Sequence, residues 1–175
     1  MKITLDHNCL IHVENGGPIA ERLRVLMNNT EHQCFVVNVG ASEMQRFGVC
    51  PDNYLAFEQF LTRIGAAHLP RLDPIGIWNV TFWDRCLYAG KQDEALLDAI
   101  KTALFGEDGL TEAGMSDPDA TRKSLNRLCD ALTMWCHISH GNEIFLTTDK
   151  NFRKATKMPR LLELGAGRIC HPHEI

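Results

Sequence analysis

The chain has 175 residues, 45% of them hydrophobic, and a formal net charge of -4. This size predicts one domain with a full core, and the mild negative charge excludes a protein that holds nucleic acid through bulk positive charge alone. The cysteines show no close pairs, and neither a signal peptide nor an apolar run of membrane-spanning length is present, so we expect a cytoplasmic protein without disulfides and without membrane contact.

The first half of the chain alternates between short apolar runs and segments of helical period. Strands are expected at residues 3–5, 34–39 and 66–69, and helices at 18–27, 41–47 and 54–64. The run at 34–39 is continuously apolar, which is typical of a strand buried on both faces. Pro18 near the start of its segment agrees with a helix that begins there.

The second half begins with residues 71–121, which we interpret as an insertion or lid. Inside and after this range we expect helices at 92–105, 121–140, 150–157 and 159–164, a polar loop at 106–119, and strands at 144–147 and 168–170. Strands separated by helices imply right-handed crossovers and a parallel sheet. The expected fold class is therefore α/β, a three-layer α/β/α domain with a mostly parallel, five-stranded sheet.

Four acidic residues follow predicted strands or lie on helices beside them: Asp6, Glu43, Asp130 and Asp149. Open α/β sheets place their chemistry at the carboxyl ends of the strands. Carboxylates gathered there repel one another unless a cation lies between them, which favours Mg²⁺ or Mn²⁺ and phosphate chemistry. We expect Asp6 and Asp149 to be the innermost metal ligands, with Asp130 and Glu43 as further ligands or orienters of metal-bound water.

Four neutral polar residues near these acids are candidates to hydrogen-bond a carboxylate or a phosphate: Asn8, Asn126, Thr147 and Thr148. Asn126 lies one helical turn before Asp130, on the same side of the expected helix. Such residues also commonly cap helices or stabilise turns, and an aspartate after a strand commonly caps the next helix. The joint order of the acids favours a functional role over these local ones.

The segments around the acids resemble the motifs of PIN-domain (PIN-like) ribonucleases. They are residues 5–11 (Leu-Asp-His-Asn-Cys-Leu-Ile), 36–43 (Val-Val-Asn-Val-Gly-Ala-Ser-Glu), 129–132 (Cys-Asp-Ala-Leu) and 147–152 (Thr-Thr-Asp-Lys-Asn-Phe). Residues 168–172 resemble the closing strand of that family. The order and the rough separations agree over nearly the whole chain. Two features depart from the family pattern: Asn151 stands where many members have a second acid, and the segment 71–121 is longer than small members need.

The resemblance implies a single PIN-like domain over residues 1–175 that acts as a Mg²⁺- or Mn²⁺-dependent endoribonuclease. Such enzymes hydrolyse phosphodiester bonds with metal-activated water and leave a 5′-phosphate. RNA is the expected substrate, and DNA is a second possibility. Many small members are toxins of the VapC type, inhibited by an antitoxin protein whose C-terminal segment crosses the active site, and homodimers are common. An antitoxin partner and a homodimer are therefore expectations for this chain.

Two other enzyme or metal hypotheses remain open. Cysteine and histidine residues, which zinc favours, occur on one expected helix and near the C-terminus: Cys129, Cys136, His137, His140, Cys170, His171 and His173. Their spacing fits a zinc site poorly, and buried cysteines explain it better. Residues 6–8 also resemble the start of haloacid-dehalogenase-type phosphatases, with Asp6 as the nucleophile, although Asn8 replaces the acid expected there.

The remaining alternative is a catalytically weak PIN-like module that binds nucleic acid or protein. An aromatic group in the insertion, with two arginines nearby, would carry the interaction: Trp78, Phe82, Trp83, Tyr88, Arg71 and Arg85. Exposed rings of this kind stack on bases or dock a protein partner or a second subunit. Packing in the core is the competing explanation for the same residues.

Overall fold

Five short strands form one parallel sheet in the order β3-β2-β1-β4-β5. The computed structural model describes residues 1–44, 51–107 and 118–175. The strands are β1 (Lys2–Leu5), β2 (Gln33–Val37), β3 (Arg71–Leu72), β4 (Ile144–Leu146) and β5 (Arg168–Cys170). Each neighbouring pair is parallel, for example Leu5 opposite Val36 on one side and opposite Leu146 on the other. The predicted five-stranded parallel sheet is confirmed.

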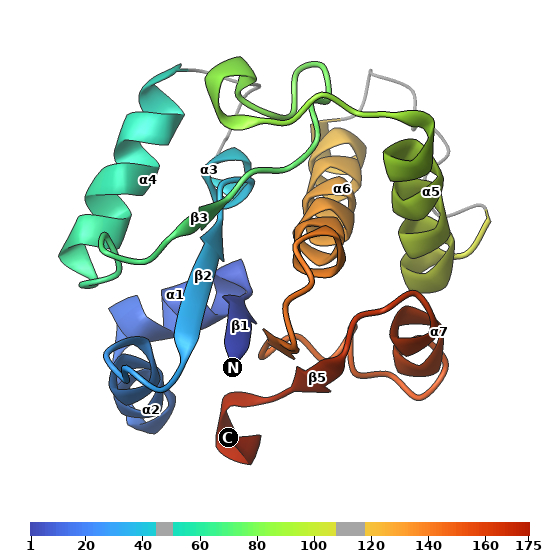
Figure 1. Ribbon diagram of the computed structural model, residues 1–175. Helices are drawn as coiled ribbons and strands as arrows, with labels where there is room; N and C mark the ends of the chain where they lie inside the picture. Colours follow the sequence, from blue (N-terminus) through green and yellow to red (C-terminus); the bar gives the residue numbers. More distant parts are fainter. Residues whose placement is uncertain (45–50, 108–117) are drawn as a thin grey trace.

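Helices cover both faces of the sheet, which confirms the three-layer α/β/α architecture (Figure 1). One face packs against α1 (His7–Asn15), α2 (Pro18–Met27) and α4 (Pro51–Arg63). The other packs against α5 (Lys91–Phe105), α6 (Pro118–Ser139) and α7 (Met158–Glu163). The four-residue α3 (Gly40–Glu43) follows β2, and two short 3₁₀ helices lie at Trp83–Arg85 and Pro172–Glu174.

Alternate side chains of each central strand enter the two cores, as the pleat of a strand requires. Leu5 of β1 belongs to the core under α1 and α2, whereas Phe145 of β4 belongs to the core under α6. Thr4 points toward α6, where its buried hydroxyl meets His137 Nδ1 at 2.9 Å and accepts from Asn142 Nδ2 at 2.8 Å. Burial lowers the pKa of His137 to about 4, so this polar cluster is neutral at pH 7 and fixes α6 against β1.

The edge strand lies at Arg71–Leu72 and not at residues 66–69, where it was predicted. Residues 66–69 form turns that close back on α4, with the Ala66 amide donating to the Leu61 carbonyl at 2.8 Å. Pairing with β2 begins only at Pro70, whose carbonyl accepts from Val36 N–H at 3.0 Å. Apolar composition alone therefore misplaced a strand of two residues, which lies within the range predicted as an insertion.

The short helix predicted at residues 150–157 is also wrong, because this stretch is a series of turns. Of its residues only Phe152 is fully buried, so no apolar stripe holds a helix there. The longest helix begins at Pro118, earlier than expected, and β2 ends two residues sooner than predicted. The end of the helical segment at 41–47 and most of the loop at 106–119 lie outside the described residues.

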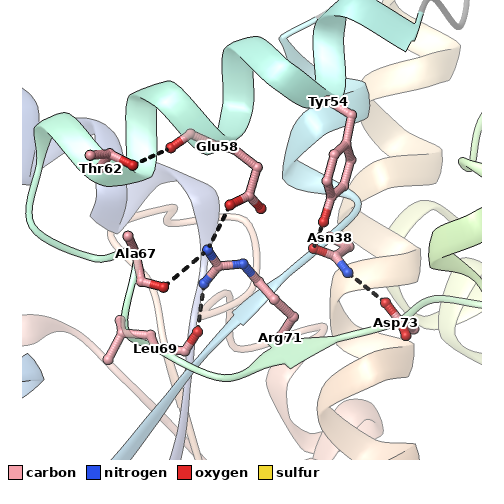
Figure 2. A network of polar contacts seen from close by, with 8 residues as sticks. All are labelled: Asn38, Tyr54, Glu58, Thr62, Ala67, Leu69, Arg71 and Asp73. Carbon is pink, nitrogen blue, oxygen red and sulfur yellow. Dashed lines mark hydrogen bonds and ion pairs between the residues drawn. The ribbon is translucent and has the colours of Figure 1, made fainter.

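A network of polar contacts attaches α4 to the β2–β3 edge of the sheet (Figure 2). Arg71 on β3 pairs with Glu58 on α4 at 3.4 Å and donates to backbone carbonyls of the turn before it. Tyr54 donates its hydroxyl to Asn38 Oδ1 at 3.0 Å, and Asn38 in turn donates to Asp73 Oδ1 at 2.5 Å. Side-chain bonds thus supplement the short ladder that a two-residue edge strand provides.

After β3, residues 73–90 cross above the carboxyl ends of the strands and reach the start of α5 (Figure 1). The predicted insertion range therefore contains an edge strand, this crossing segment and α5. Among the described helices, none combines the length and the apolar character needed to cross a membrane.

Two leucines on α4 test the packing of this layer. Leu61 is fully buried, whereas Leu55 is 59% exposed. Leu61→Ala should lower the free energy of unfolding by about 2–5 kcal/mol because it leaves a cavity in the core, and Leu55→Ala should change it by less than about 0.5 kcal/mol. Urea unfolding followed by circular dichroism measures both; equal losses for the two variants would contradict the assigned packing.

Candidate functional site

Asp6 lies at the carboxyl end of β1, and its side chain is almost completely buried, with 2% exposure. Its Oδ2 accepts a hydrogen bond from the Thr147 hydroxyl at 2.6 Å and a longer one from Asn8 Nδ2 at 3.4 Å. Its backbone N–H continues the sheet by donating to the Leu146 carbonyl at 3.0 Å. The carboxylate is therefore held in one position by Thr147, which follows β4, and by Asn8 on α1.

Thr147 connects Asp6 with Asp149. The hydroxyl that donates to Asp6 also accepts from the Asp149 backbone N–H at 2.9 Å, and the Thr147 side chain is fully buried. Asp149 is partly buried, and its Oδ1 accepts from the Asn151 N–H at 2.7 Å, which stabilises the turn after β4. Thr148 is partly buried and is not among the hydrogen-bond partners of these acids in the described part of the chain.

Glu43 is brought to the same edge by α3, which packs closely on the start of α1. A Cβ atom at Gly40 would lie 2.9 Å from His7 Nδ1 and 2.9 Å from the Phe57 ring, so only glycine permits this approach. Ser42, the residue before Glu43, donates its hydroxyl to the Val80 carbonyl at 2.5 Å. Glycine packing and this bond fix the short helix that carries Glu43.

Asp130 lies on α6 and lines a cleft of about 590 Å³ together with Asp149. Asn126, one helical turn earlier, lines the same cleft and is exposed. Asp130 is partly buried. The structure thus brings Asp130, Asn126 and Asp149 to one cleft, and it places Asn8 and Thr147 on Asp6.

Mutual repulsion links the four acids electrostatically. Burial raises the pKa of Asp6 to about 6, with a further increase from the charge of Asp149. Burial, and then the charges of Asp6 and Asp149, raise the pKa of Asp130 to about 8. Burial, Asp6 and Asp130 raise the pKa of Glu43 well above its ordinary value. Asp6 and Asp130 therefore interact with each of the other acids and lie at the centre of the group.

Basic residues line the same cleft as Asp130 and Asp149, and no motif in the sequence predicted this grouping. Five cationic side chains line the cleft with Asp130 and Asp149: Lys123, Arg127, Lys154, Lys157 and Arg160. We call this the basic cleft. The sequence did contain a sign of this basic surface, because lysine and arginine are frequent between residues 150 and 160 in a chain whose net charge is -4. Because a helix was wrongly predicted at 150–157, the grouping of Lys154, Lys157 and Arg160 in one cleft was not expected.

Lys157 connects the basic and the acidic parts of the cleft. Its Nζ donates to Asn151 Oδ1 at 2.5 Å and lies 5.6 Å from the centre of the Phe105 ring. Desolvation lowers the pKa of Lys157, and the charges of Asp149 and Asp130 act in the opposite direction. Arg127 also makes a cation–π contact with Phe105, with its guanidinium carbon 5.5 Å from the centre of the ring. One aromatic ring thus positions two cations.

No preformed metal site is present among residues 1–44, 51–107 and 118–175, where no three His, Cys, Asp or Glu side chains could hold an ion together as they are placed. This finding includes the cysteines and histidines considered for zinc. His137 uses both ring nitrogens, toward Thr4 and toward the Ala166 carbonyl at 2.8 Å, and Cys129 and Cys136 are fully buried. A zinc site built on α6 is therefore not supported.

The chemistry of the acidic group nevertheless suits a hard divalent cation. Carboxylate oxygens are the ligands that Mg²⁺ and Mn²⁺ prefer. In the described part of the chain, the charged groups that shift the pKa values of Asp6 and Glu43 are other carboxylates. A cation at this edge would relieve their repulsion, and the basic cleft beside it would attract a phosphate group.

Comparison with known proteins gives no further guide. No family model matches the chain, and neither a curated protein nor a solved structure matches it. The resemblance to PIN-domain ribonucleases therefore depends on the quoted sequence segments and stays a prediction.

The raised pKa of Asp130 predicts how stability depends on pH in the presence of EDTA. The folded carboxyl titrates at about 8 and the ordinary value is 3.8, so between pH 6.5 and 8.5 folded Asp130 loses a proton that the unfolded chain has already lost. Stability should therefore fall as pH rises through this window. His7 and His137, whose pKa values are lowered to about 4, are neutral in the folded state throughout it.

Asp130→Asn removes this titration. Its stability advantage over the unmodified chain should grow by on the order of 1 kcal/mol between pH 6.5 and 8.5, as measured by urea unfolding. Asp98→Asn is the matched control because its side chain is 74% exposed on α5. Parallel pH profiles for the Asp130 variant and the unmodified chain would show that Asp130 is not perturbed.

Proposed function

We propose that this protein is a metal-dependent endoribonuclease of the PIN-like type, which cuts phosphodiester bonds with water as the nucleophile. One observation carries the proposal: carboxylates from four separate elements interact around Asp6, and two of them share a cleft with five cationic side chains. Acids alone support many structural roles. These acids repel one another unless a cation neutralises them, and they lie beside cationic side chains that attract phosphate. This combination favours a nuclease over a structural role.

Each acid has a distinct place in the proposed reaction. Asp6 is the fixed ligand, because two hydrogen bonds and near-complete burial leave it one position. Glu43, Asp130 and Asp149 are only partly buried, and their side chains are the ones that would turn toward a shared ion. When bound, Mg²⁺ or Mn²⁺ lowers the pKa of water and neutralises charge on the reacting phosphate.

The basic cleft provides the binding energy for the strand on either side of the cut. Lys154 and Arg160 are exposed, and the charges of Asp149 and Asp130 act on the partly buried Lys157. Phosphate oxygens accept charge-assisted hydrogen bonds from such groups. Because the whole chain carries a net charge of -4, long-range attraction to nucleic acid is weak and contact is concentrated in this cleft.

A second candidate function is a PIN-like module that binds RNA or a protein without cutting. The absence of a three-ligand group among the described residues favours it. In that case the basic cleft would still bind phosphate, and the acids would bind a cation weakly or stay partly protonated. Metal dependence of cleavage separates the two functions. A toxin role with an antitoxin partner, and a homodimer, stay expectations from the family resemblance.

Removal of the central acid should abolish cleavage and metal binding together. With a mixed-sequence single-stranded RNA and Mn²⁺, Asp6→Asn should cut on the order of 100-fold more slowly, and EDTA should stop the unmodified protein. Mn²⁺ should also raise the melting temperature of the unmodified protein at pH 8 and not that of Asp6→Asn, since a bound ligand stabilises the folded state.

Asp98→Asn serves as the control for this comparison, because it removes a carboxylate of the same size from an exposed position on α5. Equal rates for Asp6→Asn, Asp149→Asn and the unmodified protein would rule out the nuclease. RNA binding without metal-dependent cleavage of RNA or DNA would favour the binding module.

Neutralising the basic cleft should weaken RNA binding and its dependence on salt. Lys154→Gln and Arg160→Gln should each lower affinity, and each lost phosphate contact should reduce the slope of log K against log salt by about 0.7 for a single strand. Fluorescence anisotropy of labelled RNA in EDTA, at salt concentrations from about 50 to about 200 mM, measures the affinity and the slope. Lys91→Gln, exposed on α5 outside the cleft, should leave the slope unchanged.

A further inference from the structure

Two exposed tryptophans lie beside the carboxyl edge of the sheet, in a cleft that the proposed reaction does not use. Trp78 is 72% exposed and Trp83 is 67% exposed. Their rings meet edge to face with centroids 5.7 Å apart. With Tyr54 and Arg85 they line a cleft of about 650 Å³, which we call the aromatic cleft. Large apolar side chains exposed together commonly mark a binding surface.

A closed loop of residues 74–87 holds these rings in place. At its base, Gly76 N–H donates to the Leu87 carbonyl at 2.9 Å, and Leu87 N–H donates to the Pro74 carbonyl at 2.8 Å. Inside it, the buried Thr81 hydroxyl accepts from the Ile77 N–H at 2.7 Å. A loop fixed in this way loses little conformational freedom when a ligand binds.

The loop is anchored next to the acids. Val80 and Phe82 are buried in the two cores, whereas Trp78, two residues before Val80, and Trp83, directly after Phe82, are exposed. The Val80 carbonyl accepts from Ser42, which precedes Glu43 in α3. Figure 1 shows the same segment crossing above the strand ends toward α5. The aromatic cleft therefore lies on the β2–β3 side of the acids, and the basic cleft lies on the β4 side.

The charges in the aromatic cleft fit a neutral ring better than a protein surface. Two acids and one base line the cleft, and each acid has a cationic partner: Glu58 pairs at 3.4 Å with Arg71, which lies outside the lining, and Asp84 lies 3.8 Å from Arg85. Aspartate and glutamate are depleted in protein interfaces, whereas Glu58 and Asp84 lie among the rings here. Arg85 also stacks over Tyr54 at 5.1 Å, which adds a second flat surface.

We infer that the aromatic cleft binds unpaired bases of a single-stranded nucleic acid whose phosphates follow the basic cleft. For the path of the strand across the acids, this inference rests on the proposed function. Bases stack on aromatic side chains with little regard to sequence, because every base has a π-face. Bases within a duplex already stack on one another, so their faces are not available to stack on the tryptophans of the aromatic cleft.

Tryptophan fluorescence tests the inference directly, in EDTA and therefore without cleavage. The chain has three tryptophans, and Trp135 is buried with its Nε1–H donating to the Asp93 carbonyl, so a ligand-dependent change reports Trp78 and Trp83. Twelve-nucleotide single strands of RNA and of DNA should each quench this emission, whereas a duplex of the same length should not. Trp83→Leu should weaken single-strand binding by about tenfold without changing its salt slope.

Tyr88→Leu is the matched control, because Tyr88 is 99% exposed in the same segment and does not line the cleft. If Trp78→Leu and Trp83→Leu still cleave RNA and bind single strands with unchanged affinity, and a single strand does not quench the unmodified protein, the inference is overturned and the nuclease proposal is left intact. Quenching and tenfold weaker binding without any cleavage would support the inference and refute the nuclease. A dimer in sedimentation that Trp83→Leu converts to a monomer would overturn the inference by assigning the cleft to a second copy.

Discussion

The hydrogen bond from Thr147 to Asp6 joins the ends of the two central strands, and the candidate site depends on it. At 2.6 Å it holds a carboxylate that is 2% exposed, and the same hydroxyl receives the Asp149 N–H. Parallel strands β1 and β4 run side by side with Leu5 opposite Leu146, so the next residues of each strand must meet. The position of Asp6 relative to Asp149 therefore follows from the register of the sheet, and it does not depend on a flexible loop.

Like charges at this edge set the second constraint. Burial and mutual repulsion raise the pKa values of Asp6 and Asp130 to about 6 and about 8, which means that the fold is less stable when they are ionised. Hydrogen bonds from Thr147 and Asn8 and the charge of Lys157 offset only part of that repulsion. A bound cation would remove the remaining repulsion. The stability that repulsion between the acids costs the fold would then be recovered as free energy of metal binding.

Long periodic or continuously apolar segments were readable from the sequence, and short irregular ones were not. The helix at 18–27 was predicted with its observed bounds because it is periodic and begins at Gly17-Pro18; the three-residue strand at 168–170 is an exception among the short segments, since Gly167 and Pro172 stand beside it. A strand of two residues at Arg71–Leu72 has no period to detect and exists because β2, Glu58 and the turn carbonyls hold it. Asp6 and Asp149 were chosen as candidates because they follow strands that are visible in the sequence, and Glu43 and Asp130 because of their place in the order of motifs. The basic cleft was missed because its members come from separate turns and helices that only the fold brings together.

Under the proposed function, the two clefts divide recognition of a strand by its chemistry. Phosphates carry charge and are bound by cations, whereas bases present flat rings that stack on aromatic side chains. Here α6 and the turns after β4 supply cations, whereas the closed loop after β3 supplies rings. The loop after β3 and the turns after β4 lie on opposite sides of β1 in the sheet order β3-β2-β1-β4-β5, so under the proposed function a strand that contacts both clefts crosses the carboxyl end of β1, where Asp6 lies.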